Sequence, residues 1–369
     1  SVSAFLLNRS SDLLVNLVNE EGYDLYAFDQ TQELEWRNFK DHDLTLNPGE
    51  GYLYANSADA VLGFAGELNS SVGNVALNYG SAYSQAGWNL VGNPFTYNVY
   101  ADRSYYVLND DGTVVDPIAA SEANAITPCT GILVKASSSS EEVGFSPTAP
   151  TGRLGNIKLL VSSVERGASS DCAIVSFNPD DALAKFVFQS NGPRLSIPQH
   201  GNDYAIVVAD EQGELPVNFK ADHNSTYSIS VCASHLDMDY LHLIYNLTGN
   251  DVDLLSRCKE GREGLNYLGT YTFEAKTSDY ASRFRLVFSV SGDANDDNDA
   301  FAYISNGQIV ITDAKVSATL QIVDVTGRIV VSCKGDAINH VSTSGMASGV
   351  YVLRLVDGDN VRVQKTMVR

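Results

Sequence analysis

Short runs of alternating or apolar residues, separated by turn residues, recur from residue 156 to residue 290. Alternation of apolar and polar residues is typical of β-strands that bury one face. Arg283 to Phe288 is the clearest case, with Phe284, Leu286 and Phe288 expected to point inward. About nine strands at this spacing predict a β-sandwich of the immunoglobulin-like or jelly-roll type. The expected strands are residues 157–161, 173–177, 185–188, 204–208, 215–219, 227–231, 240–245, 271–273 and 283–288.

The composition of the whole chain also favours an all-β fold. It contains 29 Gly and 19 Tyr, together with many Val, Thr and Ser residues, and β-branched and aromatic residues are enriched in strands. With 369 residues, the chain exceeds the usual size of one hydrophobic core. We therefore expect two or three domains.

The first segment, residues 1–149, contains an internal repeat with an offset of 80 residues. The matching residues are Tyr26 and Tyr106, Pro48 and Pro128, Gly51 and Gly131, and Leu53 and Leu133. Two copies are fewer than the three that a solenoid usually needs. We therefore expect one β domain built from two similar units, the first of them truncated.

A tryptophan-containing motif, Gly87 to Phe95, lies between the two copies. We expect Trp88, Leu90 and Phe95 to be buried and the strand to end at a Gly92-Asn93-Pro94 turn. This interpretation assigns the motif to the core of the domain.

Two linkers divide the chain. Residues 147–155 are rich in Pro, Thr and Gly, and residues 293–299 contain four aspartates, compositions that favour a solvated backbone. The expected domains are residues 1–149, a β-sandwich at 156–290 and a small immunoglobulin-like domain at 300–369, with 293–299 as an acidic linker.

The acidic linker also resembles the start of an EF-hand calcium loop. Asp293, Asn295 and Asp297 fit positions 1, 3 and 5, but Asn298 stands where the loop needs Gly and Ile304 where it needs Glu. We therefore expect no EF-hand and no resident cofactor. A looser calcium site elsewhere in this acidic chain stays open.

The formal net charge of −21 argues against nucleic acid and anionic lipid as partners, because both require a concentrated positive patch. The charge is uneven. Residues 300–369 contain 7 Lys and Arg against 5 Asp and Glu. Their net charge is thus +2, which leaves −23 for the remainder of the chain.

The chain has five cysteines, an odd number without a CxxC spacing, so neither a zinc site nor a dithiol redox site is indicated. We expect free thiols, with a disulfide between Cys232 and Cys258 as the alternative.

The last seventy residues predict a small sheet of their own. Val325 to Arg328 is typical of a tight hairpin turn in which Gly327 takes a positive φ. Asp357 to Asn360 predicts a second hairpin turn. The expected strands are residues 308–311, 318–325, 328–332, 350–356 and 361–368, and the expected buried residues are Tyr351, Leu353 and Leu355.

This segment resembles the C-terminal sorting domain of type IX secretion, an outer-membrane export route of certain Gram-negative bacteria. The signature residues are Asp324, Gly327, Arg328, Gly349, Tyr351, Lys365 and Arg369. The resemblance implies contact with the secretion machinery, a location outside the cell or at the outer-membrane surface, and cleavage in the acidic linker. That route also requires an N-terminal signal, and Ser1 begins none. We therefore expect the chain to continue a longer protein or to be a processed form.

Two further stretches resemble parts of surface proteins from the same bacteria. Gly87 to Pro94 is similar to a GWNLVGNP signature of such proteins. Residues 241–254 and 271–284 are similar to a sandwich that precedes sorting domains. These resemblances imply a fold and a context, and no reaction.

Catalytic motifs are absent from the sequence. The six histidines form no HExxH pattern, and no GxSxG elbow, P-loop or dinucleotide fingerprint occurs. His235, Asp237 and Asp239 would share one face of a strand, where a metal could bind. We expect them to form a polar loop before the strand at Tyr240 instead.

We therefore expect a surface or secreted protein that is not an enzyme and that mediates adhesion through a protein or glycan ligand, with no transmembrane segment. One alternative is the accessory C-terminal region, such as a carbohydrate-binding one, of a secreted hydrolase whose catalytic domain lies upstream of Ser1. Another is a carbohydrate-binding module within residues 156–290. Tyrosines exposed on a sheet face would favour glycan binding, and buried tyrosines would favour a scaffold.

Overall fold

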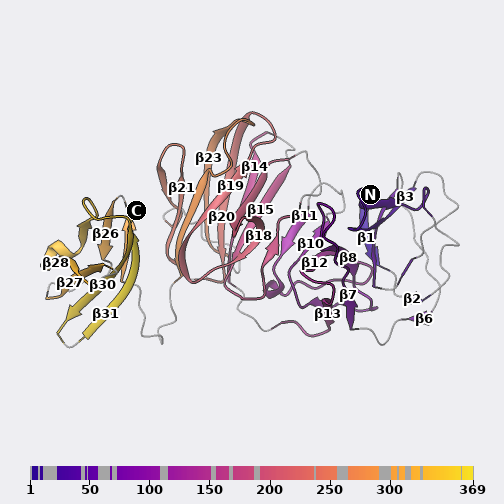
Figure 1. The fold of residues 1–369 in the computed structure, drawn as a ribbon, viewed down its shortest axis with the longest axis horizontal. Coiled ribbons are helices and arrows are strands. Elements are labelled where there is room, and N and C mark those ends of the chain that lie inside the picture. Colours follow the sequence, from indigo (N-terminus) through magenta and orange to yellow (C-terminus); the bar gives the residue numbers. More distant parts are fainter. Residues whose placement is uncertain are drawn as a thin grey trace. The chain divides into compact units, whose positions relative to one another are not determined.

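The computed structural model of the chain is all-β, as predicted (Figure 1). It describes residues 2–6, 9–10, 23–42, 46–47, 49–56, 67–68, 73–108, 115–150, 155–165, 169–186, 192–236, 238–255, 265–290, 301–305, 307–311, 317–324, 327–358 and 360–368. The chain forms two compact units. One comprises Ser1–Leu236 and Leu241–Phe288, and the other comprises Asp237–Tyr240 and Ser289–Arg369. The acidic linker lies outside the described residues.

The internal repeat forms two four-stranded sheets with the same strand order, β1-β5-β3-β4 and β8-β12-β10-β11. Tyr26 pairs with Leu53 in the first sheet, and Tyr106 pairs with Leu133 in the second. The residues that repeat in the sequence therefore pair in the same way in both sheets. The strands are β1 (Val2–Leu6), β3 (Tyr23–Phe28), β4 (Trp36–Asn38), β5 (Gly51–Asn56), β8 (Trp88–Gly92), β10 (Tyr105–Leu108), β11 (Val115–Ile118) and β12 (Gly131–Lys135).

Short strands complete the repeat region. β13 (Glu142–Ser146) pairs with β7 (Asn74–Ala76) and with β9 (Tyr100–Ala101), and β2 (Arg9–Ser10) pairs with β6 (Glu67–Leu68). The Gly144-Phe145 pair of the repeat lies on β13, whereas Gly63-Phe64 lies outside the described residues. A core beneath these strands contains Val75, Val99, Ile126, Ile132, Val134 and Val143.

A second core joins the repeat region to the sandwich. Trp88 contacts Phe186 edge to face, with ring centroids 4.9 Å apart, and Phe28 of the first copy packs on the same phenylalanine. Trp88, Leu90 and Phe95 are all buried, as predicted. Residues from both repeat copies and from the segment after residue 155 thus share one apolar cluster.

A buried aspartate reinforces this junction. Asp181, which is 1% exposed, accepts hydrogen bonds from the N–H and hydroxyl of Ser121 and from the hydroxyl of Ser176. Its backbone carbonyl accepts a hydrogen bond from the Ser104 hydroxyl at 2.7 Å. Because buried polar groups need partners, these bonds join the short 3-10 helix η2 (Ala120–Glu122) to the sandwich.

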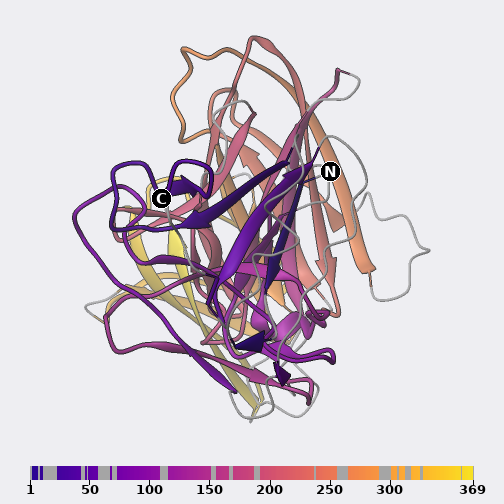
Figure 2. The same cartoon turned by 90° about the vertical axis from the view of Figure 1, so that its right-hand side faces the viewer.

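The sandwich is one continuous sheet in the order β22-β21-β24-β19-β17-β18-β15-β14-β20-β23, with β16 paired to β18. Its long strands run side by side in both views (Figures 1 and 2). The strands are β14 (Asn156–Ser163), β15 (Ser170–Ser176), β16 (Leu183–Ala184), β17 (Arg194–Gln199), β18 (Asn202–Val208), β19 (Gln212–Lys220), β20 (Ser225–Ser234), β21 (Met238–Tyr245), β22 (Asn250–Asp253), β23 (Leu265–Ala275) and β24 (Phe284–Val290).

The sheet folds over so that its two ends face each other. Phe273 on β23 packs against Phe284 on β24 at 4.9 Å between ring centroids, although these strands lie near opposite ends of the strand order. Phe219 and Tyr227 make a similar contact at 5.0 Å. The strand predicted from the alternating run at residues 283–288 is confirmed, because Phe284, Leu286 and Phe288 are buried.

The C-terminal unit contains two small sheets, β25-β26-β29 and β28-β27-β30-β31. Tyr351, Leu353 and Leu355 are buried on β30, as predicted. The short 3-10 helix η4 (Gly335–Ile338) adds Ile338 to the same core. The strands are β25 (Ala302–Ser305), β26 (Gln308–Ile311), β27 (Thr319–Asp324), β28 (Ile329–Lys334), β29 (His340–Ser342), β30 (Gly349–Asp357) and β31 (Asn360–Val368).

The cysteines of the described residues are free thiols. Cys129, Cys172, Cys232 and Cys333 have no disulfide partner, and Cys258 lies outside the described residues. Since Cys232 is free on β20, the alternative of a Cys232–Cys258 disulfide is wrong.

Candidate functional site

Three of the signature residues of the C-terminal unit form one turn. The N–H of Gly327 donates to the carbonyl of Asp324 at 2.9 Å. The Asp324 carboxylate accepts hydrogen bonds from the Arg328 N–H at 3.1 Å and from its Nε at 3.0 Å. Gly327 has a φ of 83°, a conformation that favours glycine. Asp324 and Arg328 thus close the connection between β27 and β28.

A second group of signature residues lies on the adjacent strand. Tyr351 is opposite Asp324 in the pairing of β27 with β30, and its hydroxyl donates to the carbonyl of Ala347 at 2.8 Å. Gly349 begins β30, and an added Cβ there would meet no atom within 4 Å. Tyr351 therefore anchors the start of the strand, whereas packing sets no requirement for glycine at position 349.

The remaining signature residues belong to the last strand. Lys365 is opposite Val352 on β31, one position from Tyr351. Arg369 lies outside the described residues. The structure therefore brings Asp324, Tyr351 and Lys365 to one end of the four-stranded sheet.

Comparison with known families gives one match. Residues 305–369 match the family model described as the secretion system C-terminal sorting domain. This segment is a type IX secretion sorting domain. Comparisons with curated proteins and with solved structures found no match.

The sorting domain fixes the destination of the chain. It implies export to the cell surface or the extracellular space and contact with the type IX secretion machinery. No helix among the described residues is long and apolar enough to cross a bilayer. The ligand that the remainder of the chain meets after export is a separate question, which concerns the larger unit.

A cavity of about 470 Å³ lies between the two repeat copies. Its wall includes the polar residues Asp29, Arg37 and Glu50 of the first copy and Asn78 of the segment that leads to the second. Trp88 and Leu90 contribute apolar surface. A volume of 300–1,000 Å³ with a few converging polar groups is typical of a small-molecule site.

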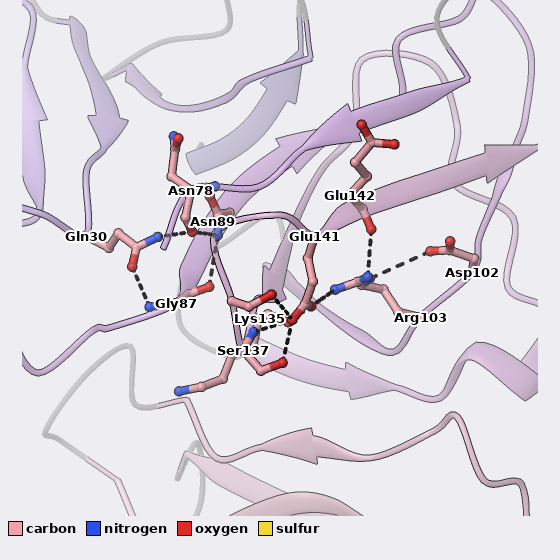
Figure 3. Close-up of polar contacts among 11 residues, drawn as sticks. Gln30, Asn78, Gly87, Asn89, Asp102, Arg103, Lys135, Ser137, Glu141 and Glu142 are labelled. Carbon is pink, nitrogen blue, oxygen red and sulfur yellow. Dashed lines mark hydrogen bonds and ion pairs between the residues drawn. The ribbon is translucent and has the colours of Figure 1, made fainter. Parts of the chain in front are cut away.

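Two buried amides fix the wall of this cavity (Figure 3). The side chain of Asn89 accepts a hydrogen bond from the Asn78 N–H at 2.8 Å and donates to the carbonyls of Asn78 and Gly87 at 2.9 Å. Gln30 accepts hydrogen bonds from the Gly80 and Gly87 N–H groups and donates to the Asn78 carbonyl. Asn89 belongs to the tryptophan motif, so that motif is structural, as predicted.

Close approach of the backbones also defines the junction of the two copies. Glu50 forms a β-bridge with Val91. A Cβ added to Gly51 would lie 2.8 Å from Cγ of Leu90, so only glycine fits there without displacement. Gly87 has a φ of 80°, and its Cβ would lie 2.2 Å from the carbonyl oxygen of Ala136. Gly51 therefore permits the two copies to meet at the cavity, whereas Gly87 permits a close approach within the second copy.

A charged cluster stabilises a neighbouring loop (Figure 3). Arg103 donates to Glu141 at 3.0 Å and to the carbonyl of Glu142 at 2.6 Å. Ser137 donates to Glu141 through its hydroxyl and its N–H. Hydrogen bonding by Ser137, followed by Arg103, lowers the pKa of Glu141 to about 2. Glu141 is therefore ionised at neutral pH and serves as an anchor.

The thiols are poor nucleophiles. Burial raises the pKa of Cys232 and Cys333 above the usual value and that of Cys172 to about 11, and partial desolvation raises the pKa of the exposed Cys129. Because the thiolate is the reactive form, these side chains stay largely protonated at neutral pH.

Two histidines of the sandwich contact carboxylates, His242 across a hairpin and His223 on the adjacent residue of a loop. His242 lies 2.6 Å from Asp251 on the β21–β22 hairpin, and His223 lies 3.1 Å from Asp222. His235 has a φ of 53° after β20, which places it in a loop, as predicted, but Asp239 lies on β21 and not in that loop, so this part of the prediction is wrong. Asp237 lies outside the described residues. Within the described residues, no group of three or more His, Cys, Asp or Glu is arranged to hold a metal.

Sequence reasoning did not single out the residues of the cavity. Asp29, Arg37, Glu50 and Asn78 lie far apart in the sequence, and each looks like an ordinary surface residue. The repeat offers one indication of the cavity residues, because the two copies share the same framework residues but differ at the positions of Arg37 and Glu50.

Proposed function

We propose that the exported body of this chain, residues 1–290, is a non-catalytic module for adhesion at the cell surface. The supporting observation is the distribution of its tyrosines. Tyr79, Tyr83 and Tyr97 in loops of the repeat region are 42–47% exposed. Exposed tyrosines supply contact area with little loss of conformational entropy, and they are enriched at interfaces.

Both regions contain buried tyrosines, such as Tyr52 and Tyr106 in the repeat region, but the described part of the sandwich has one exposed tyrosine, Tyr280, against three in the repeat region. Tyr227 and Tyr245 are buried, and Tyr227 donates to Asp222 at 2.7 Å. By the criterion of exposed versus buried tyrosines, the sandwich serves as a scaffold, and the repeat region carries the contact surface. This assignment moves the binding role away from residues 156–290.

Adhesion of beads coated with the full chain tests the proposal. We expect wild-type beads to bind a surface coated with mixed glycoproteins, and a triple Tyr79→Ser, Tyr83→Ser and Tyr97→Ser variant to bind much less. Tyr280→Ser is the matched control, because Tyr280 is a 51%-exposed tyrosine of the sandwich. Equal loss in the control and the triple variant, or no loss in either, would contradict the proposal.

A further inference from the structure

The cavity between the two repeat copies has polar groups that point to a ligand. Glu50 uses one carboxylate oxygen, Oε2, to accept hydrogen bonds from Asn47 at 3.1 Å and Tyr52 at 2.9 Å. Asp29 uses Oδ1 to accept hydrogen bonds from the N–H and hydroxyl of Thr31 at 3.0 and 2.6 Å, and its Oδ2 lies 3.9 Å from Arg37, a long contact between partly exposed side chains. Donors and acceptors of both signs therefore remain at the wall.

Asn78 adds an amide from the segment that leads to the second copy. Its backbone N–H and carbonyl are held by Asn89. Its side chain projects away from that network (Figure 3) and is exposed. The backbone is thus fixed while the amide group stays available, a form of preorganisation that lowers the entropic cost of binding.

The second repeat copy provides an internal comparison. Arg37 is opposite Ala27 in the pairing of β3 with β4, and Asp116 occupies the equivalent place opposite Val107. Glu50 precedes Gly51, and Thr130 precedes Gly131. The strand framework is the same in both copies, but the guanidinium of Arg37 is replaced by the carboxylate of Asp116. The carboxylate of Glu50 is replaced by the hydroxyl of Thr130. Because the fold forms in both copies, the polar set of the first copy is not required by the fold.

The chemistry of the wall selects the ligand class. Asp29 and Glu50 offer acceptors, Arg37 offers donors and Asn78 offers both. The formal charges of Asp29, Glu50 and Arg37 sum to −1, which opposes anionic ligands. Hydroxyl groups both donate and accept, so adjacent hydroxyls satisfy such a mixed set, whereas Trp88 and Leu90, which are 2% and 8% exposed, add only a small apolar contact.

We propose that this cavity binds a neutral sugar residue of a glycan. The inference rests on the proposed adhesive function, for which it names the ligand class. The sugar would lie between the first-copy residues Arg37 and Glu50 and the amide of Asn78. Exposed Tyr79 follows Asn78 in the chain, so further sugars of the glycan would meet an aromatic side chain beside the cavity.

The full chain should be applied to an array of neutral and anionic oligosaccharides, followed by calorimetric titration with the methyl glycoside of the terminal sugar bound best. We expect Asn78→Ala and Arg37→Met each to weaken binding at least about tenfold, as loss of hydrogen bonds to a bound polar ligand does. Ala76→Trp provides a second approach, because Ala76 is an exposed residue of the cavity wall and a large side chain there should block the sugar.

The matched controls are Asp116→Asn and Thr130→Ala, the equivalent positions of the second copy. They should leave binding unchanged, and near-ultraviolet circular dichroism should show that every variant is folded. The sugar site is overturned if the wild type binds no neutral glycan, binds only charged ones, or binds equally well in the cavity variants. If beads still adhere through the three exposed tyrosines in that case, the proposed adhesive function stands without the sugar site.

Discussion

Gly49 and Cys129 occupy the same position in the two repeat copies, and both adopt a positive φ, of 88° and 62° respectively. Each lies in a turn closed by a backbone hydrogen bond, from Glu50 to Asn47 at 3.3 Å and from Thr130 to Thr127 at 3.2 Å. A positive φ suits glycine and strains residues with a Cβ. The second copy therefore keeps a turn conformation that the Cβ of Cys129 disfavours.

Replacing Cys129 by Gly should raise the free energy of unfolding by ~0.5–1 kcal/mol, since relief of the left-handed strain exceeds the entropy that a new glycine adds to the unfolded chain. The thiol is exposed, so little packing is lost. Urea denaturation of the full chain measures the change. Gly49→Ala should have the opposite effect, because its Cβ would also lie 3.1 Å from Cγ1 of Val75. A less stable Cys129→Gly variant would contradict the argument.

Asn93 should be far more important to stability than its exposed neighbour Asn98. Its side chain is fully buried, donates to the carbonyls of Tyr97 and Ile126 at 2.8 and 2.9 Å, and accepts from the Phe95 N–H at 2.8 Å. Asn93→Ala removes the side-chain partner of the Tyr97 carbonyl and the Phe95 N–H and one of the two donors to the Ile126 carbonyl, and we expect a loss of about 2–4 kcal/mol in unfolding free energy. Asn98→Ala should change it by less than about 0.5 kcal/mol. Similar losses in both variants would show that the buried amide is not the cause.

Asp181 should be essential to the junction between the repeat region and the sandwich. Asp181→Ala removes the acceptor of Ser121 and Ser176, and we expect the unfolding free energy to fall by about 3–5 kcal/mol. Asp180→Ala is the matched control, because Asp180 is exposed. Hydrogen exchange should show the loss of protection on both sides of residue 155. Protection lost on one side alone would indicate two independent domains.

Local patterns of the sequence predicted much of the fold. The strand at 308–311 was predicted with the bounds that the structure gives it, because alternating apolar residues and turn residues are local signals. β17 was missed, since it contains Pro198 and buries three consecutive residues, Leu195 to Ile197. The three-residue strand β29 is too short to show any period. Strands were therefore missed where pairing with neighbouring strands, and not a local alternation of residues, determines that they form.

The junction and the cavity depend on contacts between distant residues. Ser121 is 60 residues from Asp181, and Ser104 is 77 residues from it, so no local pattern could mark this aspartate as buried. The same holds for Arg37 and Asn78, which only the packing of the two copies brings to one cavity. The division into domains at 1–149, 156–290 and 300–369 stays a prediction. In the structure, the first two of these segments lie in one compact unit.

Acid should weaken the loop that Glu141 anchors. Its folded-state pKa of about 2 lies below the ordinary value of 4.5, so its contribution is complete above about pH 4.5 and is lost as the pH falls towards 2. Glu141→Gln should therefore be ~1–2 kcal/mol less stable than the wild type at pH 6, after allowance for solvent screening. The two proteins should converge near pH 2. Glu142→Gln is the control, and a gap between wild type and Glu141→Gln that does not change with pH would refute the assignment.

The two signature glycines of the sorting domain should respond differently to alanine. Gly327 has a φ of 83° in the turn closed by Asp324, so Gly327→Ala should lower the unfolding free energy of the C-terminal unit by about 1–2 kcal/mol. Gly349 has open space around its Cα, and Gly349→Ala should leave stability within about 0.5 kcal/mol of the wild type. Export of the full chain should be measured in parallel. If Gly349→Ala folds normally but is not exported, the glycine serves recognition by the secretion machinery; if it unfolds the unit, the packing argument is wrong.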